Sequence, residues 1–241
     1  MLNIVIPMSG RGSRFSSVGY PDPKPLIPVG GQRMIELVID NLTPRDVSHR
    51  FIFICLEEHL RAYEVSKILK NKAPDCQIIA INQVTEGAAC SVLTAKEFID
   101  SEDPLMIANS DQWLDASIDL YLQNIKGYAG GILTMPANDP KWSFVKKNDS
   151  GFVTEVVEKQ VISDEATVGI YNFASGKSFV RAAETMIAKD IRVNGEFYVA
   201  PVYNILIREG AKIVTQNIGS SMWGLGTPED LELFLRSGHV G

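Results

Sequence analysis

The sequence predicts an α/β fold of the doubly wound kind, built on a mixed and mostly parallel sheet in a single domain of residues 1–241. Short apolar runs alternate with longer stretches of helical spacing, an order that produces parallel strands joined by helices. The composition, with 45% hydrophobic and 22% charged residues, is that of an ordinary globular protein. Neither a linker nor a low-complexity stretch divides the chain, so we expect one domain.

The first half of the chain shows the alternation most clearly. We expect strands at 2–6, 51–55, 77–81, 105–108 and 131–135. Between them we expect helices at 32–42, 57–72, 88–99 and around Leu120. Ligands of such sheets bind beyond the carboxyl ends of the strands. Residues that directly follow these strands are therefore the first candidates for a functional site.

The second half does not continue the regular alternation of strands and helices. A hairpin is predicted from strands 144–147 and 152–158, because the turn residues Asn148-Asp149-Ser150-Gly151 separate them. We then expect strands at 166–173 and 212–217 and helices at 175–188, 198–208 and 227–236. The last helix has a clear start, with Thr227 as N-cap and Pro228 at its first position.

Charge and cysteine usage limit the partners of the chain. A net charge of −6 disfavours non-specific nucleic-acid binding. The three cysteines (Cys55, Cys76 and Cys90) are scattered and do not suggest a disulfide framework. We expect no signal peptide and no membrane span, since the first apolar run is short. The expectation is a cytoplasmic protein without nucleic-acid or membrane partners, and a homo-oligomer is left open.

The most informative stretch follows the first predicted strand. It is the loop Ser9-Gly10-Arg11-Gly12-Ser13-Arg14-Phe15, continued by Pro23-Lys24-Pro25. Glycines let backbone N–H groups approach an anion, and Arg14 and Lys24 add fixed positive charge beside them. The loop is therefore suited to a polyphosphate. The alternative is that both cations are solvated surface charges.

This loop differs from two common phosphate-binding loops. A dinucleotide-binding loop would have a third glycine where Phe15 stands, with a helix opening on it. The prolines at positions 21, 23 and 25 predict that no helix begins within 16–25. The G-x-x-x-x-G-K-[ST] motif is absent from the sequence.

Gly10-Arg11-Gly12-Ser13-Arg14-Phe15 with Pro23-Lys24-Pro25-Leu26 resembles the signature of the sugar-phosphate nucleotidylyltransferases, and the likeness extends from residue 2 to about 235. The resemblance implies a Rossmann-like nucleotidyltransferase fold, similar to the GT-A glycosyltransferase fold. It implies an NTP and a phosphorylated small-molecule acceptor, a sugar 1-phosphate, as substrates, pyrophosphate as product and Mg²⁺ as cofactor. It also assigns the nucleotide to about residues 1–135 and the acceptor to about 136–241.

The resemblance assigns the nucleotide-binding residues one by one. Arg14 and Lys24 are the catalytic cations, and the nucleotide is bound by Ser9, Gly10, Gly12, Ser13, Gln83 and Gly87. In this assignment Gln83 contacts the edge of the base, which favours a pyrimidine, and Gly87 lets the nucleoside approach. Taken from its position alone, Gln83 is also explained as a polar residue at a strand end.

Asp111 is the candidate metal ligand. It follows the apolar strand 105–108, at the strand's carboxyl end. Mg²⁺ prefers one or two carboxylates together with phosphate oxygens and water, which suits an acid beside a polyphosphate loop. The resemblance implies the same role. The alternative is that Asp111 caps a turn.

The resemblance places the acceptor on residues of the second half. Lys159 holds the acceptor phosphate, Glu158 binds a hydroxyl group, and Gly169 lets the acceptor ring pass close to the backbone. The alternative for Glu158-Lys159 is an ordinary exposed charge pair.

One segment departs from the pattern. Many members of the family have an aspartate in W-x-D-x-G-T as a second metal ligand, whereas this chain has Met222-Trp223-Gly224-Leu225-Gly226-Thr227. Either waters and phosphates therefore complete the Mg²⁺ shell, or another acid substitutes for this ligand. Two other interpretations of the chain also stay open. One is a nucleotide-sugar-dependent glycosyltransferase, although Asn109-Ser110-Asp111 lacks the usual D-x-D and such an enzyme would not need Arg14 and Lys24. The other is a non-catalytic nucleotide-binding paralogue.

Overall fold

The structure, a computed structural model, describes residues 1–240. The elements of the first half are β1 (Leu2–Pro7), α1 (Ser13–Ser16), η1 (Lys24–Leu26), β2 (Pro28–Val29), β3 (Gln32–Arg33), α2 (Met34–Leu42), β4 (His49–Leu56), α3 (Glu57–Ala62), α4 (Val65–Lys72), β5 (Gln77–Ile81), α5 (Ala88–Leu93), α6 (Lys96–Ile99), β6 (Leu105–Ala108), β7 (Gln112–Leu114), α7 (Ile118–Asn124) and β8 (Gly130–Pro136). Those of the second half are β9 (Ser143–Lys147), β10 (Val153–Glu158), β11 (Glu165–Phe173), α8 (Gly176–Ala188), η2 (Ala200–Val202), α9 (Tyr203–Arg208), β12 (Ile213–Asn217), β13 (Met222–Gly224) and α10 (Pro228–Arg236).

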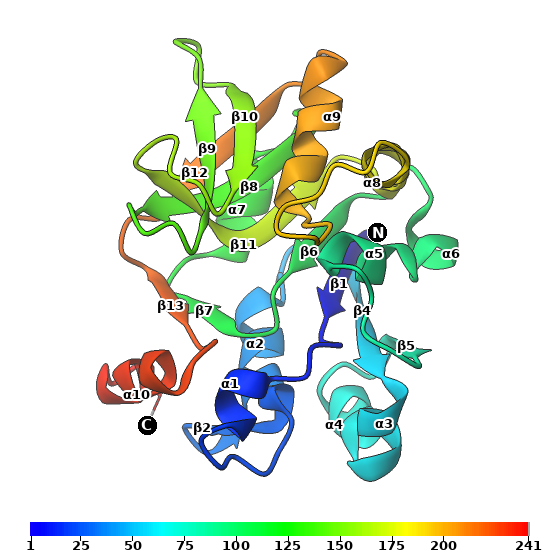
Figure 1. Ribbon diagram of the computed structural model, residues 1–241, viewed down its shortest axis with the longest axis vertical. Helices are drawn as coiled ribbons and strands as arrows, with labels where there is room; N and C mark the ends of the chain where they lie inside the picture. The colour runs from blue at the N-terminus through cyan, green and yellow to red at the C-terminus, as the bar shows by residue number, and fades with distance from the viewer. Residues whose placement is uncertain (241) are drawn as a thin grey trace.

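One nine-stranded mixed sheet runs through both halves (Figure 1). Its strand order is β10-β9-β11-β6-β1-β4-β5, and β8 pairs with both β11 and β12. The strands β6, β1, β4 and β5 are mutually parallel, whereas β11 runs antiparallel to β6, β8 and β9. The predicted α/β fold is confirmed. The same sheet continues from the predicted nucleotide half into the predicted acceptor half.

Both faces of the sheet are buried by helices, which is the doubly wound arrangement. Alternate residues of β1 point to opposite faces. Val5 joins a core with α5, α6 and α8, whereas Ile4 and Ile6 join a core with α2, α4 and α7. A strand covered on both sides can be apolar throughout, which explains the continuous apolar run at 2–6.

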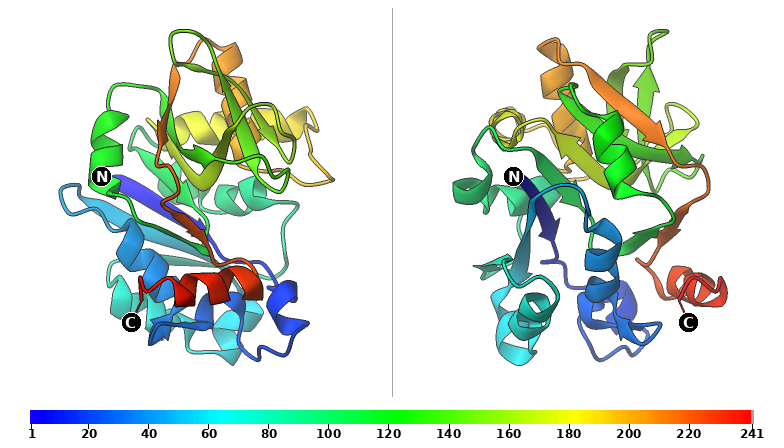
Figure 2. Two further views of the ribbon diagram at one scale, coloured as in Figure 1. Left: turned by 90° about the vertical axis from the view of Figure 1, so that its left-hand side faces the viewer. Right: turned by 180° about the vertical axis from the view of Figure 1, so that it is seen from behind.

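A third, smaller core fixes the loop that follows β1. Phe15 and Met34 from the beginning of the chain pack in it with Leu231 and Phe234 of α10. Figure 2 shows α10 lying beside these N-terminal elements. Because Phe15 is only 1% exposed, the loop is held to the body of the protein and is not a free surface segment.

The structure corrects several predicted boundaries. The helix predicted at 57–72 is two helices, because Tyr63 between them is extended. The helix predicted at 88–99 is likewise divided into α5 and α6, and the segment 198–208 becomes the turn η2 followed by α9. The expectation that no helix begins within 16–25 is wrong, since η1 begins at Lys24. Pro25 is compatible with that turn because a first-turn residue needs no N–H partner.

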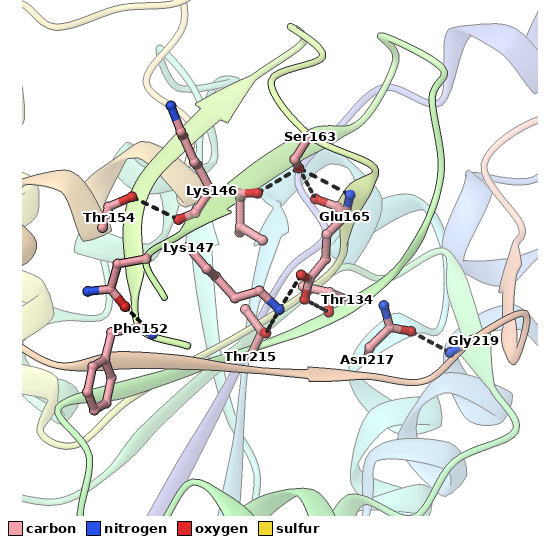
Figure 3. A network of polar contacts seen from close by, with 12 residues as sticks. Thr134, Lys146, Lys147, Phe152, Thr154, Ser163, Glu165, Thr215, Asn217 and Gly219 are labelled. Carbon is pink, nitrogen blue, oxygen red and sulfur yellow. Dashed lines mark hydrogen bonds and ion pairs between the residues drawn. The ribbon is translucent and has the colours of Figure 1, made fainter. Parts of the chain in front are cut away.

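A polar network joins the predicted hairpin β9–β10 to the rest of the sheet (Figure 3). Lys147 of β9 forms an ion pair with Glu165 of β11 at 2.5 Å, and Thr134 of β8 donates to the same carboxylate at 2.7 Å. The three cysteines are free. Within residues 1–240, none of the helices has the length and apolar character needed to cross a bilayer.

Candidate active site

The loop after β1 forms one wall of a cavity of about 340 Å³, which Ser9 and Gly10 line. Gly12 has φ +62°, and a Cβ on it would lie 3.0 Å from Cβ of Lys24. Only glycine combines that backbone conformation with such close packing at no cost. The loop is therefore shaped to bring its glycine-rich part against Lys24.

Lys24 and Asp111 meet in this cavity. The Lys24 Nζ donates to Oδ2 of Asp111 at 2.8 Å, and both residues line the cavity. Their side chains are 23% and 24% exposed, so the pair is partly open to solvent. The structure thus joins a predicted catalytic cation to the predicted metal ligand across 87 positions of sequence.

The remaining loop residues lie farther out. Ser13 and Arg14 are exposed, and both lie outside the cavity lining together with Gly12. Arg14 belongs to the one-turn helix α1, whose Phe15 points into the third core. For Arg14 to contact a triphosphate, its flexible side chain must extend toward Lys24.

The segment 222–227, which lacks the family's second aspartate, lies against Asp111. The Leu225 N–H donates to the Asp111 carbonyl at 2.8 Å, and a Cβ on Gly226 would lie 2.9 Å from Asp111 Oδ2. A Cβ on Gly224 would lie 3.7 Å from Oδ2 of Asp230. Glycine therefore leaves room around the Asp111 carboxylate, and Asp230 of α10 lies next to this strand.

The donor set is compatible with Mg²⁺ bound together with a polyphosphate. Within residues 1–240, no group of three or more His, Cys, Asp or Glu side chains is placed to hold a metal without a substrate. Mg²⁺ usually keeps several waters and takes one or two protein carboxylates with the substrate phosphates. Asp111 supplies one such carboxylate in the cavity.

Side-chain hydroxyl groups line the cavity opposite the loop. The Thr85 hydroxyl lies 2.7 Å from that of Ser91, which lies 3.3 Å from that of Ser9. Gly87, a predicted nucleotide-binding residue, lines the same cavity, but Gln83 is exposed and lies outside the lining. The sequence analysis missed Thr85 and Ser91. Ser91 is a polar residue within the buried face of α5, and this was the available signal.

A second cavity, of about 250 Å³, adjoins the first, and the two share Pro7, Ala88 and Asn109 as lining residues. Glu158 lines it, as the acceptor assignment requires. The Ser143 hydroxyl donates to the Glu158 carboxylate. Burial raises the pKa of Glu158 above its ordinary value, although that hydrogen bond opposes the rise.

Gly169 also lines the second cavity, but packing alone already accounts for a glycine at this position. It has φ +77°, and a Cβ on it would lie 2.2 Å from Nδ2 of Asn109. The Asn109 N–H donates to the Gly169 carbonyl at 3.1 Å. Glycine at this position therefore lets β11 approach the segment that leads to Asp111.

Lys159 is exposed and lies outside the lining of the second cavity. Its Nζ donates to the Tyr198 hydroxyl and lies 4.6 Å from the centroid of that ring. This hydrogen bond raises the pKa of Lys159. Tyr198 itself lines the cavity, as do Lys141 and Trp142, which the sequence analysis missed. Trp142 stands directly before β9, but its sequence neighbours do not indicate that it faces a cavity.

A larger cavity lies at the other end of the sheet. It measures about 750 Å³ and is lined by residues at the amino ends of the parallel strands, including Leu2 and Pro104. Seven of the predicted functional residues line the two smaller cavities at the carboxyl ends: Ser9, Gly10, Lys24, Gly87 and Asp111 in the first, and Glu158 and Gly169 in the second. The other five, which are Gly12, Ser13, Arg14, Gln83 and Lys159, lie outside both linings. In doubly wound sheets the carboxyl end is the one that binds ligands.

Comparison with known proteins identifies the family of the chain. The family model described as nucleotidyl transferase matches residues 4–198, and the chain belongs to that family of enzymes. A crystal structure of the nucleoside-diphosphate-sugar pyrophosphorylase from Vibrio cholerae RC9 has 27% sequence identity and a TM-score of 0.84, with 97% of this chain and 99% of that chain covered. The inositol-1-phosphate CTP transferase from T. maritima shares the fold, with 15% identity, a TM-score of 0.74 and coverage of 98% and 96%.

The curated relatives are longer proteins. The bifunctional protein GlmU of Burkholderia orbicola (strain MC0-3) is 25% identical over 239 residues, which make up 96% of this chain and 50% of the relative. The chain therefore spans about half the length of the curated relatives it matches.

Proposed function

We propose that this chain transfers a nucleotidyl group from an NTP to the phosphate of a small-molecule acceptor, a sugar 1-phosphate, and releases pyrophosphate. One observation carries the proposal. The cavity that holds Lys24 and Asp111 shares a wall with the cavity that holds Glu158, so a triphosphate in the first and a phosphorylated acceptor in the second would meet at that wall.

The reaction is an in-line displacement at the α-phosphorus. An oxygen of the acceptor phosphate forms the new P–O bond, and the bond between the α-phosphorus and the bridging oxygen of pyrophosphate breaks. The acceptor phosphate is largely a dianion near neutral pH, with a second pKa of about 6, and needs no protein base to attack. The protein therefore contributes mainly positioning and charge stabilisation.

The residues of the chain divide these tasks. Lys24 stabilises the charge that develops on the α-phosphate, and Arg14 with the loop amides stabilises the departing pyrophosphate. Asp111 would hold Mg²⁺, which when bound supplies charge neutralisation on the phosphates. Glu158 and Lys159 would bind the acceptor. We place the activity in nucleotide-sugar synthesis for surface polysaccharide, in the cytoplasm.

The test is a panel of ATP, CTP, GTP, UTP and dTTP crossed with a panel of sugar 1-phosphates, with pyrophosphate release as the readout. We expect one NTP to release pyrophosphate only when an acceptor is present and Mg²⁺ is added. A glycosyltransferase would instead consume a nucleoside-diphosphate sugar and release no pyrophosphate. A non-catalytic paralogue would bind an NTP without turnover, and either of these outcomes would reject the proposal.

A further inference from the structure

Two segments, far apart in the sequence, are joined between the two cavities. The first is residues 85–89, of which Thr85, Gly87 and Ala88 line the nucleotide cavity. The second is the turn at 190–199, which we call the acceptor-side turn. It contributes Glu196 to the nucleotide cavity and Tyr198 to the acceptor cavity. Neither assigned substrate is confined to one half of the chain.

Backbone contacts join the two segments directly. The Phe197 N–H donates to the Glu86 carbonyl at 2.8 Å, and the Ala89 N–H donates to the Phe197 carbonyl at 3.0 Å. A Cβ on Gly87 would lie 2.4 Å from the Phe197 carbonyl oxygen. Gly87 is therefore needed for this close backbone approach, whether or not a nucleoside also contacts it.

Arg192, which lines neither cavity, contacts both of the joined segments. It forms ion pairs with Glu86 at 2.6 Å and with Asp190 at 2.5 Å, and it donates to the Gly195 carbonyl at 3.1 Å. Its guanidinium carbon lies 4.0 Å from the centroid of the Phe197 ring. A planar guanidinium can make all of these contacts at once, which a lysine cannot.

The acceptor-side turn is otherwise well defined. Asn194 and Gly195 both have positive φ, and Val193 and Glu196 exchange two backbone hydrogen bonds of 3.0 Å. This is the pattern of a tight two-residue hairpin. Phe197, at 1% exposure, anchors the base of the turn in the core. A displacement of the turn must therefore be transmitted to residues 86–89.

We propose that Arg192 is a positioning residue for the nucleotide, through which the acceptor-side turn holds the segment 85–89 in its nucleotide-binding conformation and couples the two cavities. An acceptor that contacts Tyr198 restrains the turn, and the turn restrains Gly87 and Ala88. Coupling between two binding sites is reciprocal, so each substrate should tighten the binding of the other. The substrates in this inference rest on the proposed function.

Nucleotide binding without acceptor is the first test. Each of the five NTPs is titrated by calorimetry into wild-type protein, Arg192→Ala, Arg192→Lys and Glu86→Gln. We expect Arg192→Ala to weaken nucleotide binding about three- to tenfold, the scale of one partly exposed ion pair and one cation–π contact. Arg192→Lys and Glu86→Gln should have smaller effects, and adding Glu86→Gln to Arg192→Ala should change little more.

Arg181→Ala is the matched control. Arg181 forms a two-contact ion pair with Glu209, at 2.5 and 2.6 Å, and lines neither cavity. It should leave nucleotide affinity unchanged, even if the melting temperature falls. Equal nucleotide affinity in wild type and Arg192→Ala would overturn the inference, as would equal weakening by Arg181→Ala.

Coupling is tested with the substrate pair that the panel identifies. In wild type we expect the KM for the NTP to fall as the acceptor concentration rises, and in Arg192→Ala we expect this dependence to be lost with a smaller change in kcat. A wild type that binds nucleotide but releases no pyrophosphate rejects the proposed function, while weaker nucleotide binding by Arg192→Ala still supports the positioning role. A wild type that binds none of the five NTPs rejects both.

Discussion

Two lysine–carboxylate pairs in this protein have similar lengths and different surroundings. Lys147 and Glu165 are 2.5 Å apart, the Glu165 side chain is 9% exposed, and Thr134 donates to its second oxygen (Figure 3). Lys24 and Asp111 are 2.8 Å apart in a cavity, and each side chain is about a quarter exposed. The two oxygens of the Glu165 carboxylate accept from side chains of two neighbouring strands, β9 and β8, whereas the Asp111 carboxylate faces a cavity and remains open to a ligand.

The difference teaches how to separate a structural ion pair from a functional one. A buried charge is tolerated when several donors satisfy it, and its removal then costs stability. A partly exposed pair contributes little to stability, so the removal of one partner should cost little stability. Substitutions at the two lysines should therefore affect different measurements.

The largest effect is expected from Lys24→Ala. Turnover should fall by more than about a hundredfold, the scale of losing one preorganised charged donor, while the melting temperature changes little. Lys147→Ala should do the reverse and lower the melting temperature with turnover nearly intact. Pyrophosphate release and thermal unfolding measured on both variants test the comparison, and near-normal turnover in Lys24→Ala would remove this lysine from the mechanism.

Asp111→Asn keeps the shape of the side chain and removes its charge. We expect activity to require about ten- to a hundredfold more Mg²⁺ or Mn²⁺, since one charge-assisted contact is lost. The measurement is the initial rate across a metal titration, with Asp103→Asn as a control whose acid pairs with the N-terminus instead. Full wild-type activity in excess EDTA would contradict a metal role for Asp111.

Lys159→Ala should chiefly raise the acceptor KM, by about ten- to a hundredfold, because one charge-assisted contact to a phosphate is worth roughly 1.5–3 kcal/mol. Lys159 is exposed and bonds to Tyr198, which lines the acceptor cavity, so we expect its ammonium group to reach an acceptor bound there. The KM for the NTP should change much less. Unchanged kinetics would mean that Lys159 is an ordinary surface charge.

The sequence alone predicts those elements whose bounds are set by a local pattern of residues. The strands β5 and β6 have the predicted bounds, because each is a short apolar run between clear breaks. The Lys24–Asp111 meeting was foreseeable in outline, since both residues follow parallel strands whose carboxyl ends lie together. Neither the distance nor the openness of the pair follows from these patterns.

The elements and contacts that the sequence analysis missed depend on pairing between residues far apart in the chain. The strands β7 and β13 have three residues each and exist because Trp113 pairs with Trp223, which no local pattern indicates. The ion pair between Arg192 and Glu86 also joins segments far apart in the sequence, so no local pattern indicates it. The junction between residues 85–89 and the acceptor-side turn was likewise not predicted, because sequence order does not show which loops share a wall.

The smallest expected effects concern the pH dependence of stability, where two glutamates of the second half should differ in sign. Burial tends to raise the pKa of Glu165, but hydrogen bonds from Lys147 and Thr134 outweigh it and lower the pKa. A lowered folded-state pKa stabilises the protein above the unfolded value of about 4.3, and this contribution is lost as the pH falls through the folded value. Burial raises the pKa of Glu158, so its contribution is present below about pH 4.3 and is lost as the pH rises through the folded value.

The two glutamine variants test these signs by urea unfolding at several pH values between 3 and 8. Glu165→Gln should cost about 1–3 kcal/mol at pH 7 and progressively less as the pH falls below about 4, because the wild-type carboxylate is then protonated as well. Glu158→Gln should be neutral or stabilising at pH 7, since it removes a buried charge and keeps an acceptor for Ser143. Glu102→Gln, at an exposed pair with Lys177, serves as the control with little effect at any pH. A loss of stability in Glu158→Gln at pH 7 as large as that in Glu165→Gln would show that the charged Glu158 carboxylate stabilises the fold, which would contradict the sign expected from its raised pKa.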